Sequence, residues 1–375
     1  MRTLAQVLAA LASAAVLAAC ARNSAPNGHP AEDSDKVLNV YNWFDYIDRS
    51  VIVDFEKESG IHVNYDVFDS DEVLETKLMT GHTGYDIVVP STPVLERAIA
   101  AGALRPLDKA RLPNLQNLDP ETVRFMAIFD PGNRYAVIYT WLNTTGIAYD
   151  ATQITARVPQ APTDSLRMLF APELLARFQD CGVAVIDSPV DAVEMALLYL
   201  GKNPASESPG DLKAAEAVLM GMRRYVRYID TGRYMSDLAS GEVCLALGWS
   251  GDVMQARNRA KEASQHVDLR FSIPREGSVN GADVVAIPVD APHGENAHRF
   301  IDFLLRPEVA ARISNTVGYA NGVTAAMPLL RPELRNDPVY YPPAEVRSKL
   351  YPERARSEAF TRQLTRLWTR FKMAT

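Results

Sequence analysis

The chain has 375 residues and a formal net charge of −7, and its composition is that of an ordinary globular protein, with 47% hydrophobic and 23% charged residues. A chain of this length favours two domains or lobes over a single core. The mild acidity argues against a general nucleic-acid-binding protein, which would carry a basic stripe, and it is compatible with small cationic partners.

Residues 1–20 predict an export signal. Arg2 precedes an apolar run that is rich in alanine and leucine and ends at Cys20. The run is short and ends in small residues, which distinguishes it from a membrane span. Its last four residues, LAAC, resemble the bacterial lipobox, which implies that Cys20 is acylated and starts the mature chain; cleavage of a plain signal peptide near Ala18 or Ala19 is the alternative. Residues 21–36 then read as a polar, flexible tether.

Strand and helix patterns alternate from residue 36 onward. Residues 37–43 and 61–68 have strand patterns, residues 48–60 and 70–81 have helical spacing, and residues 85–91 read as a buried strand. This βαβαβ order predicts an α/β fold with a mostly parallel sheet and helices on both faces. Ligands of such sheets bind beyond the carboxyl ends of the strands.

A second series of strands and helices begins near Cys181. Strand patterns cover 181–188, 242–252, 269–274 and 281–289, and helical patterns cover 189–201, 252–263 and 298–314. We expect the last of these to be one amphipathic helix. Two α/β lobes with a cleft between them account for both series.

The remaining cysteines, Cys181 and Cys244, form an even pair in an exported chain. Both lie in apolar runs that read as buried strands, so the pattern favours a disulfide in an oxidising compartment. Two unpaired core thiols are the alternative. A bridge between residues 63 positions apart would stabilise the fold by roughly 4 kcal/mol in the chain-entropy treatment.

Signatures of catalysis are missing from the sequence. It contains no HExxH motif, no phosphate-binding loop and no GxSxG elbow, and its six histidines are scattered. Two cysteines with scattered histidines do not make a zinc site. We therefore expect no enzyme, no catalytic residues, no cofactor and no metal.

Aromatic side chains stand beside carboxylates at three predicted strand ends. Taken singly, each has an ordinary explanation: a turn residue for Asp45, a helix N-cap for Asp252, a solvated strand end for Asp283, and core packing for the tryptophans. Together they predict a site for an organic cation, because rings attract cations and a buried ammonium group needs a carboxylate. The residues are Trp43, Asp45, Tyr46, Trp249, Asp252 and Asp283.

Several segments, among them VLNVYNWFDYI, LASGEVCLALGWSGDVMQARNRAKEA and YPPAEVRSKL, resemble the periplasmic putrescine/spermidine-binding proteins, the solute receptors of polyamine ABC transporters. The resemblance runs from about Val37 nearly to the C-terminus. It implies a two-lobed periplasmic solute-binding protein of type II, with a ligand cleft between discontinuous lobes. Lobe 1 would comprise residues 37–140 and 263–321, and lobe 2 residues 141–262 and 322–375. The two cysteines are similar in position to a disulfide of some family members.

The resemblance also implies a ligand site. Aromatic residues would form a cage, Asp252 and Asp283 would hold the ammonium groups, and the remaining positions would line the cleft. The implied residues are Trp43, Phe44, Asp45, Tyr46, Ser91, Asp191, Trp249, Asp252, Asp283 and Tyr319.

Three positions depart from the family pattern. Phe44 stands where the family commonly has serine or threonine, Asp191 where it has glutamate, and Gly281 where it has an aromatic cage residue. We hypothesise that bulk at Phe44 refills volume vacated at Gly281. The alternative is that the changes are independent and the pocket is simply wider.

The expected function is that of an extracytoplasmic receptor that closes around putrescine or spermidine and delivers it to an inner-membrane ABC permease. We expect a monomer in the periplasm, with no nucleic-acid partner and with the lipid on Cys20 as its membrane attachment. The alternatives are a receptor for another cationic amine such as agmatine or cadaverine, a polyamine-sensing lipoprotein, and an exported hydrolase or transferase.

Overall fold

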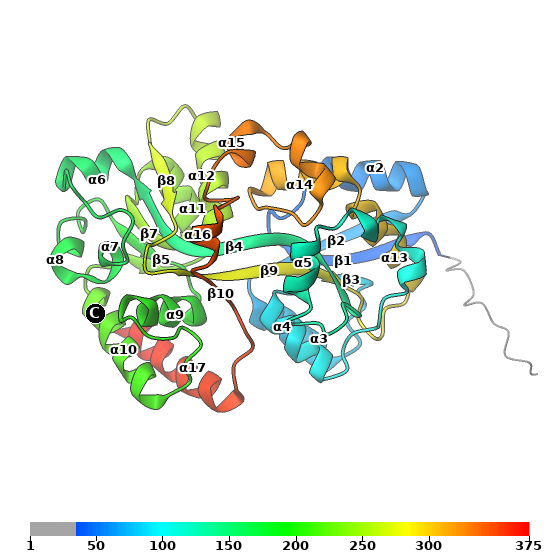
Figure 1. Ribbon diagram of the computed structural model, residues 1–375, viewed down its shortest axis with the longest axis horizontal. Helices are drawn as coiled ribbons and strands as arrows, with labels where there is room; N and C mark the ends of the chain where they lie inside the picture. The colour runs from blue at the N-terminus through cyan, green and yellow to red at the C-terminus, as the bar shows by residue number, and fades with distance from the viewer. Residues whose placement is uncertain (1–34, 375) are drawn as a thin grey trace, which may run out of the picture. The chain divides into compact units, whose positions relative to one another are not determined.

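The computed structural model describes residues 35–374, and the residues from Lys36 onward form one compact unit (Figure 1). The predicted signal segment, the lipid-anchor candidate Cys20 and nearly all of the tether lie outside the described residues. Within residues 35–374 no helix has the length and apolar character needed to cross a bilayer.

The first five elements follow the predicted order. They are β1 (Val37–Trp43), α2 (Arg49–Ser59), β2 (His62–Phe68), α3 (Asp71–Thr80) and β3 (Ile87–Val88). Local chemistry sets the ends of α2: the Asp48 carboxylate accepts a hydrogen bond from the Ser50 backbone N–H, and Gly60 ends the helix with φ of 70°. β1 pairs in parallel with both β2 and β3, so the carboxyl ends of these strands meet at one edge.

The other helices and strands follow in chain order. They are α4 (Thr92–Ala100), α5 (Pro120–Met126), β4 (Ala136–Asp150), α6 (Ala151–Arg157), α7 (Arg167–Phe170), α8 (Pro172–Leu175), β5 (Val183–Val185), α9 (Pro189–Tyr199), α10 (Pro209–Arg223), β6 (Tyr228–Ile229), α11 (Tyr234–Ser240), β7 (Leu245–Trp249), α12 (Ser250–Glu262), β8 (Leu269–Ser272), β9 (Ser278–Ala286), α13 (Gly294–Leu304), α14 (Pro307–Val317), α15 (Pro332–Arg335), α16 (Ala344–Arg347), β10 (Leu350–Pro352) and α17 (Glu358–Met373), with short 3-10 turns at Lys109–Arg111, Pro113–Asn117 and Thr324–Leu329.

The described strands form one mixed sheet in the order β2-β1-β3-β9-β4-β7-β5-β6, with β10 paired to β9 and β8 to β4. The α/β class is confirmed. The parallel pairing expected from the βαβαβ order joins β1, β2 and β3, but the sheet as a whole is mixed, because the two long strands pair antiparallel. Parallel pairing joins β1 to β2 and β3, β5 to β6 and β7, and β10 to β9. Antiparallel pairing joins β4 to β9, β7 and β8, and β9 to β3. The two long strands lie side by side and connect the two parallel groups (Figure 1).

Sequence patterns missed β4, the longest described strand. Its first part pairs with β9, and its second part, from Thr145 on, pairs with β7 and β8. Within the first part the register against β9 shifts between Ile138 and Thr140 and again between Thr140 and Asn143. Leu142, inside this irregular stretch, takes the left-handed φ of 56°. Nearly every residue of β4 is buried, so the strand lacks the alternation that marks a half-exposed one.

The core of the described part of the chain contains two large groups of buried residues. One group joins residues of β1, β2, α13 and α14, and the other joins residues of β5, α9, α10 and α17. The lobe division itself stays a prediction.

The expected single helix over residues 298–314 was wrong. The chain forms α13 and α14 instead, separated at Leu305 and Arg306. Pro307 explains the break, because proline lacks the backbone N–H that a continuous helix needs and excludes helical conformation from the residue before it. Arg306 accordingly has an extended ψ of 137°.

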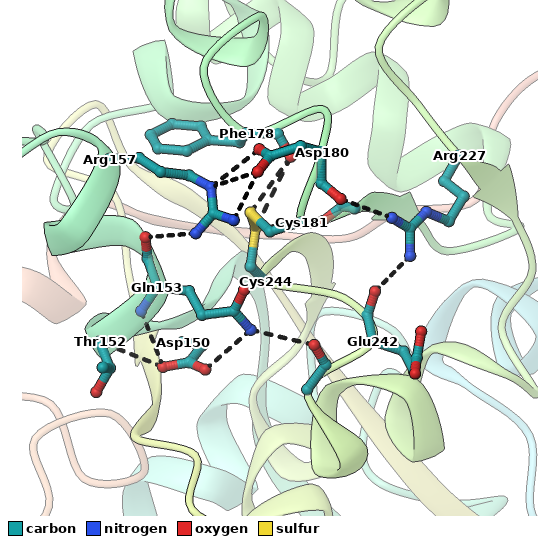
Figure 2. The surroundings of a disulfide bond; sticks show 12 residues. Asp150, Thr152, Gln153, Arg157, Phe178, Asp180, Cys181, Arg227, Glu242 and Cys244 are labelled. Atoms are coloured by element: carbon teal, nitrogen blue, oxygen red, sulfur yellow. Dashed lines mark hydrogen bonds and ion pairs between the residues drawn. A yellow bond between two sulfur atoms is a disulfide. The ribbon is translucent and has the colours of Figure 1, made fainter.

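The predicted disulfide between Cys181 and Cys244 is present, with the two Cα atoms 5.5 Å apart (Figure 2). It joins the segments that enter β5 and β7, which are parallel neighbours in the sheet. Arg157 forms an ion pair with Asp180 at 2.7 Å beside the bridge. The disulfide therefore belongs to the core of the second group of residues.

Candidate functional site

Asp283 accepts hydrogen bonds from side chains of two other segments, the residues after β1 and the strand β4. It lies on β9 and is 7% exposed. Its Oδ2 accepts hydrogen bonds from the hydroxyl of Tyr46 at 2.6 Å, the hydroxyl of Thr140 at 3.1 Å and the amide of Asn143 at 2.7 Å. All three donors are neutral. Burial therefore dominates, and it raises the pKa of Asp283 to about 6.

Asp252 lies in a similar setting on another element. It is 8% exposed and accepts hydrogen bonds from the hydroxyls of Tyr234 at 2.5 Å and Tyr319 at 3.4 Å. Burial raises its pKa to about 6. The N-cap interpretation of Asp252 was wrong, because α12 begins at Ser250 and Trp249 occupies the N-cap position.

Aromatic residues connect the two carboxylates. The rings of Tyr46 and Tyr319 meet edge to face, with centroids 5.6 Å apart. Since Tyr46 bonds Asp283 and Tyr319 bonds Asp252, an unbroken line of contacts runs between the two acids. The Tyr234 hydroxyl extends this line by accepting the Trp249 backbone N–H at 3.2 Å.

Asp191 joins the same network from the first turn of α9. It accepts hydrogen bonds from the Ser188 hydroxyl at 2.7 Å, the Trp249 indole N–H at 3.3 Å and the Thr145 hydroxyl. It is 5% exposed, and burial raises its pKa. The structure thus brings six of the predicted site residues into one hydrogen-bonded and ring-packed network: Tyr46, Asp191, Trp249, Asp252, Asp283 and Tyr319.

Ser91 reaches the network through its backbone, which forms an isolated β-bridge with Asp283. Its hydroxyl donates to Oδ2 of Asp71 at 2.6 Å. Burial, together with the charge of Asp283, raises the pKa of Asp71 to about 7. Asp71 therefore belongs to the same acidic neighbourhood, although the sequence did not single it out.

Residues 43–46, at the end of β1, lie partly in the network and partly at the surface. Trp43 is half-buried against Phe68, with ring centroids 4.6 Å apart. Phe44 is 60% exposed. Asp45 adopts a left-handed φ of 52° and pairs with Arg259 at 2.6 Å. The turn interpretation therefore describes the backbone of Asp45, and the predicted ligand contacts of these three residues stay predictions.

The space beside Gly281 is bordered by a carboxylate. A Cβ built at this glycine would lie 3.3 Å from Oε2 of Glu353 and 3.9 Å from the Asn143 carbonyl oxygen, with no other heavy atom within 4 Å outside its chain neighbours. The hypothesis that Phe44 refills this volume stays a prediction; the side chain that lies next to the Cβ position is that of Glu353. Phe44 instead exposes its ring.

Sequence reasoning missed several network residues: Asp71, Thr140, Asn143, Tyr234 and Glu353. Two of them, Thr140 and Asn143, interrupt the apolar run of β4. Polar side chains inside a fully buried strand are a usable signal, because such groups require partners. The others carry no comparable mark in the sequence.

The network offers negative charge without metal-binding geometry. Among residues 35–374 no group of three or more histidine, cysteine, aspartate or glutamate side chains is arranged to hold a metal ion. Within the described residues, the carboxylates of Asp191, Asp252 and Asp283 accept hydrogen bonds from hydroxyl, amide and indole groups. Such an arrangement suits an organic cation that brings its own hydrogen-bond donors.

Comparisons with known proteins agree with this chemistry. The family described as bacterial extracellular solute-binding protein matches residues 50–340. The chain is 47% identical over 339 residues to the putrescine-binding periplasmic protein PotF of Escherichia coli, which covers 90% of this chain and 91% of that protein. It is 42% identical over 336 residues to a putrescine/agmatine-binding protein of Pseudomonas aeruginosa, which covers 89% of this chain and 91% of that protein.

Among solved structures, the fold is similar to the spermidine/putrescine ABC transporter substrate-binding protein PotD of Streptococcus pneumoniae. The TM-score is 0.75 at 29% identity, covering 90% of this chain and 99% of that one. The members of this family are binding proteins and not enzymes, which confirms that expectation. The chain therefore belongs to the putrescine/spermidine-binding periplasmic protein family of the bacterial extracellular solute-binding proteins.

Proposed function

We propose that this protein is an extracytoplasmic receptor that binds putrescine or a related polyamine and delivers it to an ABC transporter. One observation carries the proposal: Asp252 and Asp283 are 8% and 7% exposed, and neither forms an ion pair within the described part of the chain. An uncompensated buried charge costs several kcal/mol. A diamine carries one cation for each carboxylate.

The rings supply the rest of the binding energy. Tyr46 and Tyr319 lie between the two acids, and Trp249 lies beside Asp191. A ring that faces an ammonium group contributes about 0.5–2 kcal/mol. Micromolar affinity requires about −8 kcal/mol. Two charge pairs and three or four ring contacts supply this after the entropy costs of binding are subtracted.

Delivery to a transporter rests on the family. A polyamine ligand and an ABC transporter are the partners that the family implies. We propose an inner-membrane permease as the docking partner and a monomeric receptor. The two lobes would close on the connection formed by β4 and β9, where the register shift and the left-handed Leu142 interrupt regular pairing.

The proposed location is the periplasm, which is where the names of the relatives place them. We further propose that a lipid on Cys20 anchors the chain to a membrane. Replacing Cys20 by alanine would release the protein into the soluble periplasmic fraction, as fractionation and mass spectrometry would show. An unmodified Cys20, or a mature chain that lacks it, would contradict the anchor.

A thermal-shift panel of amines tests the ligand. Putrescine, spermidine, cadaverine, agmatine and a neutral amino acid would each be added to the purified protein. A ligand at a hundredfold excess over its dissociation constant adds about 2.7 kcal/mol of stability. A panel in which no amine stabilises the protein would overturn the proposed function.

Agmatine is the second candidate because one relative is named a putrescine/agmatine-binding protein. Its guanidinium group presents a planar pair of donors, which suits a carboxylate. A larger shift with agmatine than with putrescine would make it the preferred ligand while leaving the receptor role intact.

A further inference from the structure

Residues 353–357 connect β10 to α17 and cross between two parts of the fold (Figure 1). The segment begins at the end of β10, which pairs with β9, and it ends at α17, whose buried residues pack with those of α9 and α10. On its other side lies α4, whose buried residues pack with those of β3 and β9. The segment therefore runs between helices that belong to different groups of core residues.

α4 holds this segment through one carboxylate. Oε1 of Glu96 accepts hydrogen bonds from Nε and Nη2 of Arg354 at 2.9 and 2.5 Å, and Oε2 accepts one from the Ala355 backbone N–H at 2.8 Å. The Arg354 guanidinium also lies 5.5 Å from the ring centroid of Phe129, which is buried in the same group as α4. The side chains of Glu96 and Arg354 are 16% and 44% exposed. The pair is well oriented and yet accessible to water, so it can break and form again.

The other end of the segment is held by buried contacts. Arg356 forms an ion pair with Glu194 of α9 and donates to the Pro204 carbonyl oxygen at 2.7 Å, and the paired side chains are 7% and 3% exposed. The backbone N–H and the hydroxyl of Ser357 donate to Glu207 at 2.8 and 2.5 Å. Breaking a buried ion pair leaves an uncompensated charge, whereas an exposed pair is replaced by water at little cost. This end therefore stays in place when the pair on α4 breaks.

The proposed hinge lies between the two partners of the Glu96–Arg354 pair. On β9 the irregular pairing with β4 falls between Gly281 and Asp283. β10, which leads into the segment, pairs with β9 before Gly281, whereas α4 begins directly after the residue that forms a β-bridge with Asp283. A rotation about this hinge changes the separation between α4 and the segment. The pair can thus form in only one arrangement of the two lobes.

We propose that the Glu96–Arg354 pair is a latch that stabilises the closed arrangement of the lobes and so slows the release of the ligand. In the same arrangement Asp45, after β1, meets Arg259 of α12. The inference rests on the proposed function, because it requires closure on β4 and β9. Neither latch residue belongs to the network around the proposed ligand, so the latch acts on the equilibrium between open and closed forms. A contact made only in the closed form stabilises that form equally, whichever amine is bound.

Binding kinetics with putrescine and with agmatine test the latch. Stopped-flow tryptophan fluorescence would give the association and dissociation rate constants, and calorimetry the affinities. The unmodified protein would be compared with Glu96→Gln, Arg354→Gln and the double variant. Glu58→Gln is the matched control, because Glu58 forms a partly exposed ion pair with Arg306 at 2.6 Å between elements of a single group of core residues. Thermal melts would verify that each variant folds.

We expect Glu96→Gln to weaken the binding of both amines by the same factor, about fivefold, which corresponds to about 1 kcal/mol. The loss should lie in faster dissociation, with the association rate constant changed by less than about twofold. Arg354→Gln and the double variant should match Glu96→Gln, because all three remove the same interaction. Glu58→Gln should match the unmodified protein.

Two kinds of failure are distinguishable. Unchanged dissociation rates in Glu96→Gln, a loss that differs between the two amines, or additive losses in the double variant would overturn the latch and leave the receptor role intact. Failure of the unmodified protein to bind any amine would overturn the proposed function, and the inference with it.

Discussion

The two ends of the proposed site, around Asp283 and around Asp252, are similar in burial and pKa but differ in the elements and hydrogen bonds that surround the carboxylate. Both carboxylates are more than nine-tenths buried, and burial raises both pKa values to about 6. Asp283 lies on a strand and accepts three short hydrogen bonds. Asp252 lies in the first turn of α12 and accepts one short and one long hydrogen bond.

This difference indicates which of the two carboxylates interacts more strongly with a ligand cation. The first turn of a helix is favourable for a negative charge, because the unpaired N–H groups there carry partial positive charge. Asp252 receives this support, and Asp283 does not. We therefore expect the ligand to interact more strongly with Asp283, although the pKa values of the two acids are alike.

Replacing each acid by asparagine tests this ranking. Asp283→Asn and Asp252→Asn each remove one partner of a buried charge pair, which costs about 3–5 kcal/mol, or at least a hundredfold in affinity. Calorimetry with putrescine should show the larger loss for Asp283→Asn. Asp164→Asn is the control, because Asp164 is an exposed aspartate whose ion pair spans 3.7 Å. A larger loss for Asp252→Asn would contradict the helix-terminus explanation.

Acidification is expected to weaken binding. With both pKa values near 6, each acid is mostly protonated at pH 5, so putrescine affinity should fall about a hundredfold between pH 8 and pH 5. In Asp283→Asn the fall should be about tenfold, because one titrating group remains. Calorimetry across this range measures both slopes. A flat profile would show that neither acid binds the ligand.

The ligand-free protein should show the opposite dependence on pH. A carboxyl group whose folded pKa is raised stabilises the fold below its unfolded pKa, and this stability is lost as the pH rises through the folded pKa. For Asp252 and Asp283 the window runs from about pH 4 to about pH 7. The contribution to unfolding free energy is on the order of 3 kcal/mol for each group. Denaturant titrations without ligand would measure it, and saturating putrescine should abolish most of the decline.

Removing one hydroxyl at each end gives a smaller effect. Tyr234→Phe leaves Asp252 with the single donor Tyr319 at 3.4 Å, whereas Tyr46→Phe leaves Asp283 with Thr140 and Asn143. A hydrogen bond to a charged group contributes about 1.5–3 kcal/mol, so we expect about a tenfold loss of affinity for Tyr234→Phe and a smaller one for Tyr46→Phe.

Calorimetry checks the order of the two tyrosine variants. Tyr225→Phe is the control, since Tyr225 is a half-buried tyrosine whose ring faces Arg224 and which has no part in the network. A larger loss of affinity for Tyr46→Phe than for Tyr234→Phe would indicate that the number of remaining hydrogen bonds does not determine how strongly each carboxylate is stabilised in its ionised form.

The smallest effect is expected at Asp45. Its ion pair with Arg259 is about 40% exposed on both sides, and exposed pairs contribute about 0–1 kcal/mol. Asp45→Asn should therefore change putrescine affinity less than about fivefold. A loss as large as that for Asp252→Asn would show that Asp45 binds the ligand directly, as the family resemblance implied.

Much of the local structure was predictable from short-range patterns. β1, α2 and β2 follow from alternation, helical spacing, the Asp48 cap and Gly60. The break before Pro307 was equally visible in the sequence and was overlooked. β4 was not predictable in the same way, because a strand buried on both faces has no alternating pattern.

By itself the sequence determined the local features of the chain. These are the buried-strand patterns, the aromatic residues beside carboxylates, the pair of cysteines and the family resemblance. Only the tertiary structure decided which acids lack a cationic partner. Tyr46 and Asp283 are 237 positions apart and yet form a 2.6 Å hydrogen bond, and Glu353 reaches Gly281 only because β10 pairs with β9. Burial and pairing are properties of packed neighbours, so the charge left for a ligand is fixed by contacts between distant segments and not by any local pattern.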